Sequence, residues 1–165
     1  MNTYNFKDFV IRVFNDADHN LSSTDNINTY FKRYFGISGE SHPVSMRGIK
    51  VYRDEDVVNS CILVASGGVT GVTSLSSCLE DDQLLVCCCD TVFCLTPDTL
   101  NLLWQVQGDP VTCFGIYKIH QDYLIHGELE VTRIDKSGSI KWRFSGSDIF
   151  VTTNENSIPG RNRVR

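Results

Sequence analysis

Residues 82–96, Asp82-Gln-Leu-Leu-Val-Cys-Cys-Cys-Asp-Thr-Val-Phe-Cys-Leu-Thr96, decide the class of fold. Two apolar runs, rich in β-branched, aromatic and cysteine side chains, are separated by Asp90, a residue type that favours turns. Short runs of this composition between turn signals predict neighbouring β-strands. The same pattern extends from Gly48 towards the C-terminus, so most of the chain is predicted to be β.

Turn signals such as Asp81-Asp82, Gly108-Asp109-Pro110 and Lys136-Ser-Gly138 divide this region into short strands. Strands of this length and spacing build sandwiches, barrels or propeller blades. The candidate strands are Ile49–Tyr52, Cys61–Ala65, Thr73–Cys78, Gln83–Cys88, Thr91–Thr96, Leu102–Val106, Cys113–Ile119, Tyr123–His126, Glu130–Asp135, Ile140–Phe144 and Ile149–Thr152.

An internal repeat lies within this region. Two units of the chain align with each other. The first unit consists of Asp82-Gln-Leu-Leu-Val, Val92-Phe-Cys-Leu-Thr and Leu102-Leu-Trp104. The second unit consists, in the same order, of Asp122-Tyr-Leu-Ile-His, Val131-Thr-Arg-Ile-Asp and Ile140-Lys-Trp142. Repeat units of this length are common in propellers and arrays, and each unit is predicted to form three antiparallel strands that end at Trp104 or Trp142.

The second unit, Val131-x-x-Ile-Asp-x-x-Gly-x-x-x-Trp142, resembles the blade repeat of quinoprotein-type (PQQ-like) β-propellers. The first unit departs from it, because Thr96 stands in place of Asp135. The run 82–152 also resembles small uncharacterised bacterial proteins. These resemblances imply a bacterial origin and blade-like repeats. They imply no quinoprotein activity and no cofactor, because a propeller needs at least four blades.

Residues 1–36 show a different spacing of apolar residues. Phe6, Phe9, Val10, Val13 and Phe14 recur at the spacing of an amphipathic helix. A second set repeats this spacing; it consists of Ile27, Tyr30, Phe31, Tyr34 and Phe35. The spacing predicts an N-terminal helical hairpin that packs on the sheet.

Composition excludes several classes of function. The formal net charge of −5 argues against a nucleic-acid partner, which requires a basic face. There is no apolar run long enough to span a bilayer and no signal peptide in the sequence, so we expect no membrane partner and a cytoplasmic location. The seven cysteines are then expected to be free thiols in or near the core, because disulfides rarely persist in a reducing compartment.

One polar cluster could bind a metal. His126, Glu128 and Glu130 alternate, so on a continuous strand they would project from one face, and His120 lies nearby. Two imidazoles and two carboxylates suit a transition metal. The simpler interpretation is that these side chains form the solvent face of an amphipathic strand, and Gly127 could break the strand.

The segment Ser66-Gly67-Gly68 follows a predicted strand and is a second candidate. Backbone N–H groups of a glycine-rich loop can line a small-molecule site. However, a phosphate-binding loop would require a Lys-Ser/Thr ending or a glycine pattern that opens a helix. Neither is present, and a bulge or wide turn explains the glycines better.

The sequence thus predicts an α+β, mainly β domain over residues 1–153. It comprises a helical hairpin (1–36) packed on a meandering antiparallel sheet or sandwich of propeller-blade-like repeats (48–153), with a flexible tail (154–165). The predicted function is non-enzymatic binding of a protein partner through a sheet edge, with an immunity-type inhibitor as one form of it. The alternative is a metal-binding protein or metal-dependent enzyme that uses His120, His126, Glu128 and Glu130.

Overall fold

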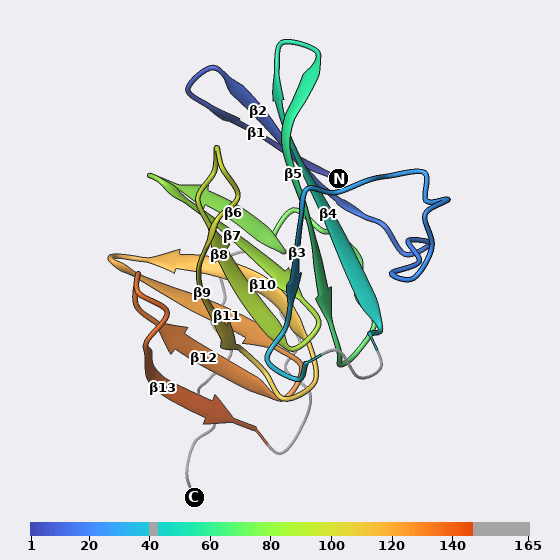
Figure 1. Ribbon diagram of the computed structural model, residues 1–165. Helices are drawn as coiled ribbons and strands as arrows, with labels where there is room; N and C mark the ends of the chain where they lie inside the picture. The colour runs from blue at the N-terminus through green and yellow to red at the C-terminus, as the bar shows by residue number, and fades with distance from the viewer. Residues whose placement is uncertain (40–42, 147–165) are drawn as a thin grey trace, which may run out of the picture.

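Thirteen strands form three sheets in the computed structural model, which describes residues 1–39 and 43–146 (Figure 1). Sheet A has the order β1-β2-β4-β5-β3, sheet B the order β6-β7-β8-β9, and sheet C the order β10-β11-β12-β13. The strands are β1 (Asn2–Phe6), β2 (Phe9–Asn15), β3 (Lys32–Phe35), β4 (Ser45–Arg53), β5 (Asp56–Ala65), β6 (Ser77–Glu80), β7 (Gln83–Cys88), β8 (Thr91–Leu95), β9 (Leu102–Gln107), β10 (Cys113–Ile119), β11 (Asp122–Gly127), β12 (Glu130–Ile134) and β13 (Ile140–Ser145).

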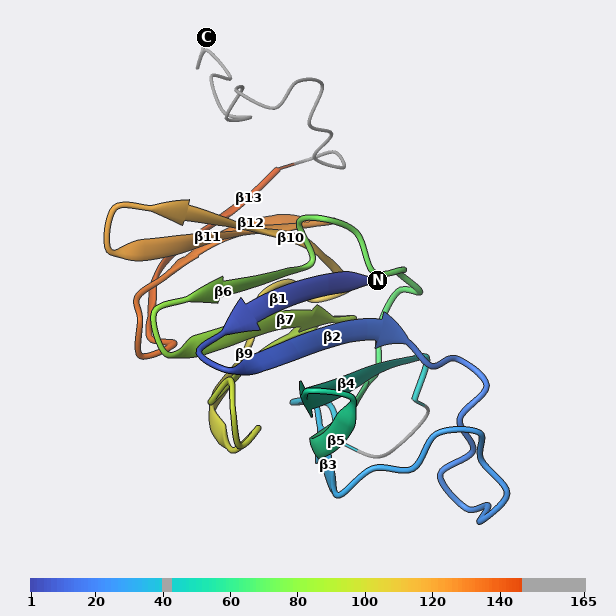
Figure 2. The ribbon, with the colours of Figure 1, turned by 90° about the horizontal axis from the view of Figure 1, so that it is seen from above.

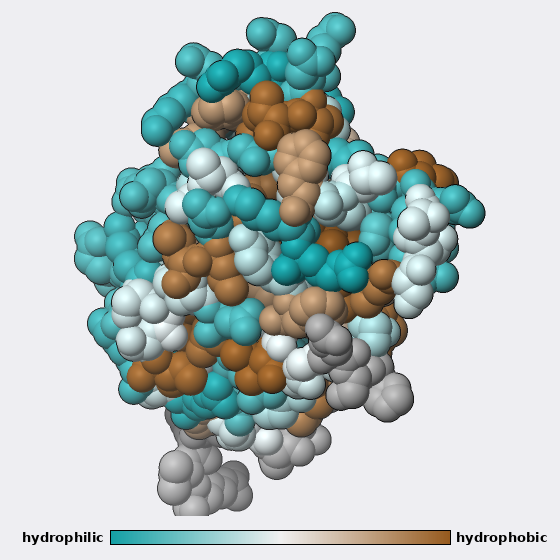
Figure 3. Space-filling view, viewed as in Figure 1, coloured by the Kyte–Doolittle hydropathy of each residue, from teal (hydrophilic) through white to brown (hydrophobic). Residues whose placement is uncertain are grey.

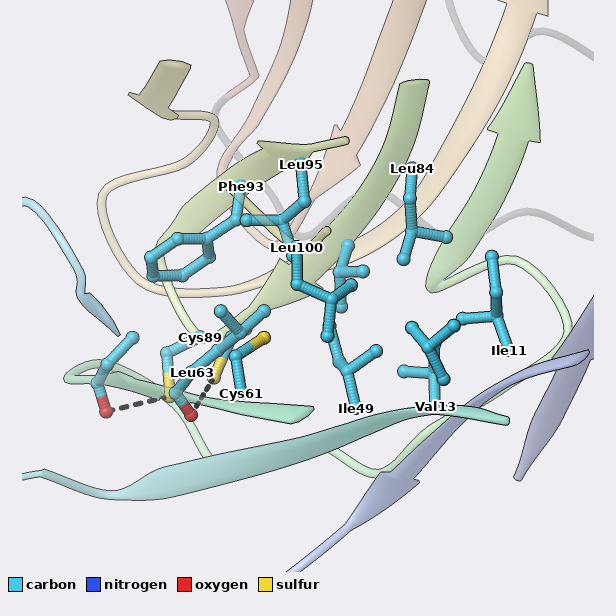
Figure 4. Close-up of a cluster of buried hydrophobic side chains, with 14 residues drawn as sticks. Ile11, Val13, Ile49, Cys61, Leu63, Leu84, Cys89, Phe93, Leu95 and Leu100 are labelled. Atoms are coloured by element: carbon cyan, nitrogen blue, oxygen red, sulfur yellow. Dashed lines mark hydrogen bonds between the residues drawn. The ribbon is translucent and has the colours of Figure 1, made fainter. Parts of the chain in front are cut away.

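The three sheets are stacked as layers, with sheet B between sheets A and C (Figure 2). Alternate side chains of β7 and β8 point to opposite faces, as the pleat of a strand requires. Leu84 and Phe93 pack against sheet A, in the core drawn in Figure 4, whereas Leu85 and Val92 pack against sheet C. The continuous apolar runs of residues 84–95 therefore reflect burial on both faces of one sheet.

The predicted N-terminal helical hairpin is wrong, because the described part of the chain is all β and contains no helix. Phe6 and Phe9 flank a two-residue hairpin turn in which Lys7 has a φ of 52°, so their spacing of three only imitates a helix. In β2, Ile11 and Val13 are fully buried on one face, while Arg12 is exposed on the other. The fold is therefore not α+β, and β-branched side chains outweighed the apparent helical spacing.

The second predicted helix also fails. Ile27 is 98% exposed and Phe31 66% exposed, so this spacing does not mark a buried stripe. The chain from 16 to 31 is instead a loop on the outer face of sheet A. Tyr30 donates a hydrogen bond to Asp16, and Lys50 of β4 donates one to Asn28 Oδ1 at 2.7 Å. After this loop β3 pairs in parallel with β5, the one parallel pairing within the described residues.

The prediction of a mainly β chain from Gly48 onward is confirmed, and strands from β7 to β13 begin and end within about one residue of the predicted bounds. β4 and β5 are longer than predicted, and β6 begins at Ser77 rather than Thr73. The strand predicted at Ile149–Thr152 and the tail predicted at 154–165 lie outside the described residues.

The two repeated stretches form equivalent strands. In sheet B, Cys94 pairs with Trp104 and the register shifts before Leu95, and in sheet C, Arg133 pairs with Trp142 with the same shift. For the first strand of the repeat, the alignment made from the sequence is wrong by one residue. The equivalent turn residues with positive φ are Asp81 and His120, so Leu85, and not Leu84, corresponds to Leu124.

All seven cysteines are free thiols, as predicted, and six of them are fully buried in the two cores. Burial raises the pKa of Cys78 and of Cys94 to about 12, so both are uncharged at neutral pH. Across residues 1–39 and 43–146, no helix is both long and apolar enough to cross a membrane.

Candidate functional site

The predicted metal-binding residues do not converge. His120 is an exposed turn residue between β10 and β11, with a φ of 53°. His126 lies towards the other end of β11, about 20 Å away along a strand that rises about 3.3 Å per residue. The two imidazoles therefore cannot share one metal ion.

The two glutamates also diverge. His126 is 9% exposed and lies beside the rings of Phe114 and Tyr117, with centroids at 5.7 and 6.5 Å. Glu128 is in the turn between β11 and β12, whereas Glu130 accepts hydrogen bonds from Ser145 and Arg143. Within the described ranges, no three His, Cys, Asp or Glu side chains are grouped so as to hold a metal ion. Metal binding by these four residues stays a prediction, and the structure does not bring their side chains together at one position.

The loop candidate Ser66-Gly67-Gly68 is packed against its neighbours. A Cβ on Gly67 would lie 2.2 Å from the Val111 carbonyl oxygen, and one on Gly68 would lie 2.0 Å from Thr112 Oγ1. The Gly68 N–H donates to the Val111 carbonyl at 2.9 Å, and the Ser66 carbonyl accepts from Asp90 N–H at 3.3 Å. Glycine is therefore required at position 67 by the close backbone of Val111 and at position 68 by the close side chain of Thr112.

Arg47 was not singled out by the sequence, yet its guanidinium is almost fully buried beneath the same loop. It donates to the carbonyl and the hydroxyl of Thr70, the latter at 2.9 Å, and its Nε has no partner among the described atoms. A hydrogen bond from Cys88, helped by the positive charge of Arg47, lowers the pKa of Cys89 to about 7. Because Cys89 is fully buried, soluble reagents cannot reach its thiol without opening of the structure.

Asp109 organises the junction between sheets B and C. Its carboxylate is fully buried and accepts four backbone hydrogen bonds, from Val111 and Thr112 in its own loop, from Leu129 in the turn between β11 and β12, and from Glu130 at the start of β12. The four distances lie between 2.7 and 2.8 Å. The carboxylate therefore has a structural role, which the Gly108-Asp109-Pro110 turn signal alone did not reveal.

Sheet C has an outer face, opposite sheet B, with exposed aromatic side chains. Trp142 and Phe144 on β13 point to this face and are 43% and 48% exposed. Val131 pairs with Phe144 on the same face and is 9% exposed. We call this surface the sheet C outer face; its residues are Tyr117, Leu124, His126, Val131, Arg133, Trp142 and Phe144.

Two basic side chains on this face share one carboxylate. Arg133 contacts Asp122 at 2.6 Å, and Lys141 contacts the same carboxylate at 2.8 Å. The hydrogen bond from Lys141, and then that from Arg133, hold the pKa of Asp122 below its usual value. Asp122 is 3% exposed, so an aromatic surface lies beside a satisfied ion pair and not beside an unpaired charge.

Apolar side chains elsewhere are distributed differently. On the side of the molecule in Figure 3, small apolar groups are separated by hydrophilic ones, which is ordinary for a protein surface. The sheet C outer face instead combines neighbouring aromatic side chains with β13, an edge strand of the described sheet. This arrangement suits binding of an apolar surface or of another strand.

Comparison with known proteins adds no family: no protein-family model matches the chain, and no curated protein matches it in sequence.

Proposed function

We propose that this protein is a non-enzymatic protein-interaction domain that binds its partner through the sheet C outer face and the adjoining edge strand β13. The observation that carries the proposal is the exposure of Trp142 and Phe144, at 43% and 48%. The equivalent residues of sheet B, Trp104 and Val106, are packed against sheet C.

The area involved suits a binding hot spot. Aromatic side chains bury about 150–250 Å² each, so covering the exposed parts of Trp142 and Phe144 would remove about 200 Å² of mainly apolar surface from water. At about 25 cal/mol per Å² this corresponds to about 5 kcal/mol. Hot spots of this size, built on tryptophan and other large side chains, commonly dominate an interface.

The edge of β13 offers a second means of attachment. Within the described residues β13 is the last strand of sheet C, and a partner strand can add to such an edge through main-chain hydrogen bonds. An immunity-type inhibitor that neutralises a toxin domain is one form of this function. The seven free thiols support the cytoplasmic location included in this proposal.

Affinity capture from an extract of the host, with a matched pair of variants, tests the proposal. Phe144→Arg places a charge on the sheet C outer face, whereas Ile27→Arg makes the same kind of change at a loop residue that is 98% exposed. We expect a stoichiometric partner with the wild type and with Ile27→Arg, and loss of that partner with Phe144→Arg at unchanged melting temperature. Capture of the same partner in equal amounts by both variants would refute the proposal.

A further inference from the structure

The same kind of contact joins each sheet to the next. From sheet A, Asn59 Nδ2 donates to the carbonyl of Asp98 at 2.8 Å, in the turn between β8 and β9 of sheet B. From sheet B, Trp104 Nε1 donates to the carbonyl of Lys136 at 3.0 Å, in the turn between β12 and β13 of sheet C. β5 and β9 are each the fourth strand in the order of their sheets. In both cases a side chain of that strand donates a hydrogen bond to a carbonyl in the last turn of the following sheet.

A glycine completes the second of these contacts. A Cβ on Gly138 would lie 2.6 Å from the indole of Trp104, so the ring packs directly on the backbone of the turn. Gln83 Nε2 donates to the same Lys136 carbonyl at 3.2 Å. Trp104 is therefore held by both a hydrogen bond and a close contact with a glycine.

Sheet C repeats, position by position, the face that sheet B turns towards it. The registers of the two sheets place Trp142 at the position of Trp104, Val131 at that of Val92 and Leu124 at that of Leu85. The full set of equivalent pairs is Cys78 and Tyr117, Leu85 and Leu124, Cys87 and His126, Val92 and Val131, Cys94 and Arg133, Trp104 and Trp142, and Val106 and Phe144.

We propose that the partner contributes an antiparallel β-sheet that stacks on sheet C as sheet C stacks on sheet B. Trp142 Nε1 donates to a carbonyl in a hairpin turn of that sheet, next to a glycine on which the indole packs. This inference rests on the proposed function and names the partner's structure: a sheet with an apolar face, like that formed by Tyr123, Ile125 and Ile134, and a glycine-containing turn.

A second copy of the chain fits this position poorly. The outer face of sheet A is partly covered by its own loop, since a Cβ on Gly48 would lie 2.3 Å from the hydroxyl of Tyr30. It also carries the guanidinium of Arg12, stacked on Tyr52 at 4.7 Å, and the ammonium of Lys50.

Site-specific photo-crosslinking tests this geometry in the complete chain. p-Benzoylphenylalanine replaces Trp142, the protein is irradiated in an extract of its host, and the crosslinked peptides are identified by mass spectrometry. The same probe in place of Trp104 is the internal control, and we expect it to crosslink to residues 136–138 of its own chain. At position 142 we expect crosslinks to a hairpin turn of a partner β-sheet, beside a glycine.

The variant Trp142→Phe provides a second measurement that does not depend on the probe. It keeps an aromatic ring and removes the N–H donor, so we expect affinity for the crosslinked partner to fall about five-fold, the usual net effect of one hydrogen bond. An unchanged affinity would exclude the carbonyl contact.

The outcomes separate this inference from the proposed function. Crosslinks from position 142 to a helix, to an extended strand paired with β13 or to a second copy of this chain would overturn the stacked-sheet geometry. Absence of any crosslink from position 142, while Phe144→Arg still abolishes capture, would also overturn the stacked-sheet geometry. In each of these cases the proposed binding through sheet C would remain supported. Capture that survives Phe144→Arg would refute the proposed function itself.

Discussion

Removal of the Asp109 carboxylate should destabilise the protein strongly, although this residue lies in a loop. Asp109 is fully buried and accepts hydrogen bonds from Val111, Thr112, Leu129 and Glu130. Two of these donors belong to the loop that enters sheet C, and the other two lie where the turn after β11 leads into β12. Asp109→Ala would therefore leave two segments without the acceptor that holds them together.

The size of the effect follows from these bonds. Hydrogen bonds to a charged group contribute about 1.5–3 kcal/mol each, so four of them set an upper bound of about 6–12 kcal/mol. Leu129 is 40% exposed, so water can satisfy part of the turn after substitution. We expect Asp109→Ala to lower the free energy of unfolding by about 3–5 kcal/mol. At about 2–4 °C per kcal/mol for a chain of this size, Tm should fall by about 6–20 °C.

Two further variants make the comparison specific. Asp109→Asn keeps one acceptor oxygen and should lose about half as much, because its NH₂ group cannot accept from Leu129 and Glu130. Asp98→Ala, in the turn between β8 and β9, removes a single bond to the Thr99 N–H and should cost about 0.5–1.5 kcal/mol. Urea unfolding of the three variants gives the free energies. Equal, small losses for Asp109→Ala and Asp98→Ala would refute the structural role of Asp109.

Three other measurements test separate parts of the structure. Gly127→Ala should destabilise the protein by several kcal/mol, since a Cβ there would lie 2.3 Å from Asp109 Oδ2, and a melting temperature within about 2 °C of wild type would contradict this packing. The free energy of unfolding should fall as pH rises above about 9. Burial raises the pKa of Cys78 and Cys94 to about 12, so these thiols lose their protons at lower pH in the unfolded chain than in the folded one. The double variant Cys78→Ala, Cys94→Ala should show a smaller decline in a pH series of urea melts. The metal alternative predicts that His126→Ala removes a copurifying metal; we expect elemental analysis to show the same metal content in both proteins, and a loss would revive the alternative.

Much of the β region could be predicted from the sequence because each strand is bounded by its own turn signal. The N-terminal region could not, because the turn at Lys7-Asp8 places Phe6 and Phe9 three residues apart and imitates a helix. The β-branched residues of β2 were the better signal, since Ile11 and Val13 are buried on one face in strict alternation.

The candidate surface could be predicted only in part. The equivalence of Trp104 and Trp142 could be seen as a repeat in the sequence. Which of the two tryptophans is covered by a neighbouring sheet depends on how the sheets stack, and the sequence does not show this. Asp109 was noted only as a turn residue, since two of its four donors lie about twenty residues further along the chain. Arg47 lies just before the β region predicted from Gly48 onward, and its burial arises from a loop that folds back over it.

Hydrogen–deuterium exchange of the chain with and without its captured partner tests the central claim most directly. If the partner binds the sheet C outer face and the β13 edge, the amides of Ile140–Ser145 should become protected while those of the exposed loop around Ile27 keep their rates. Protection confined to sheet A or to the loop at Ser66–Gly68, with β13 unchanged, would contradict the account.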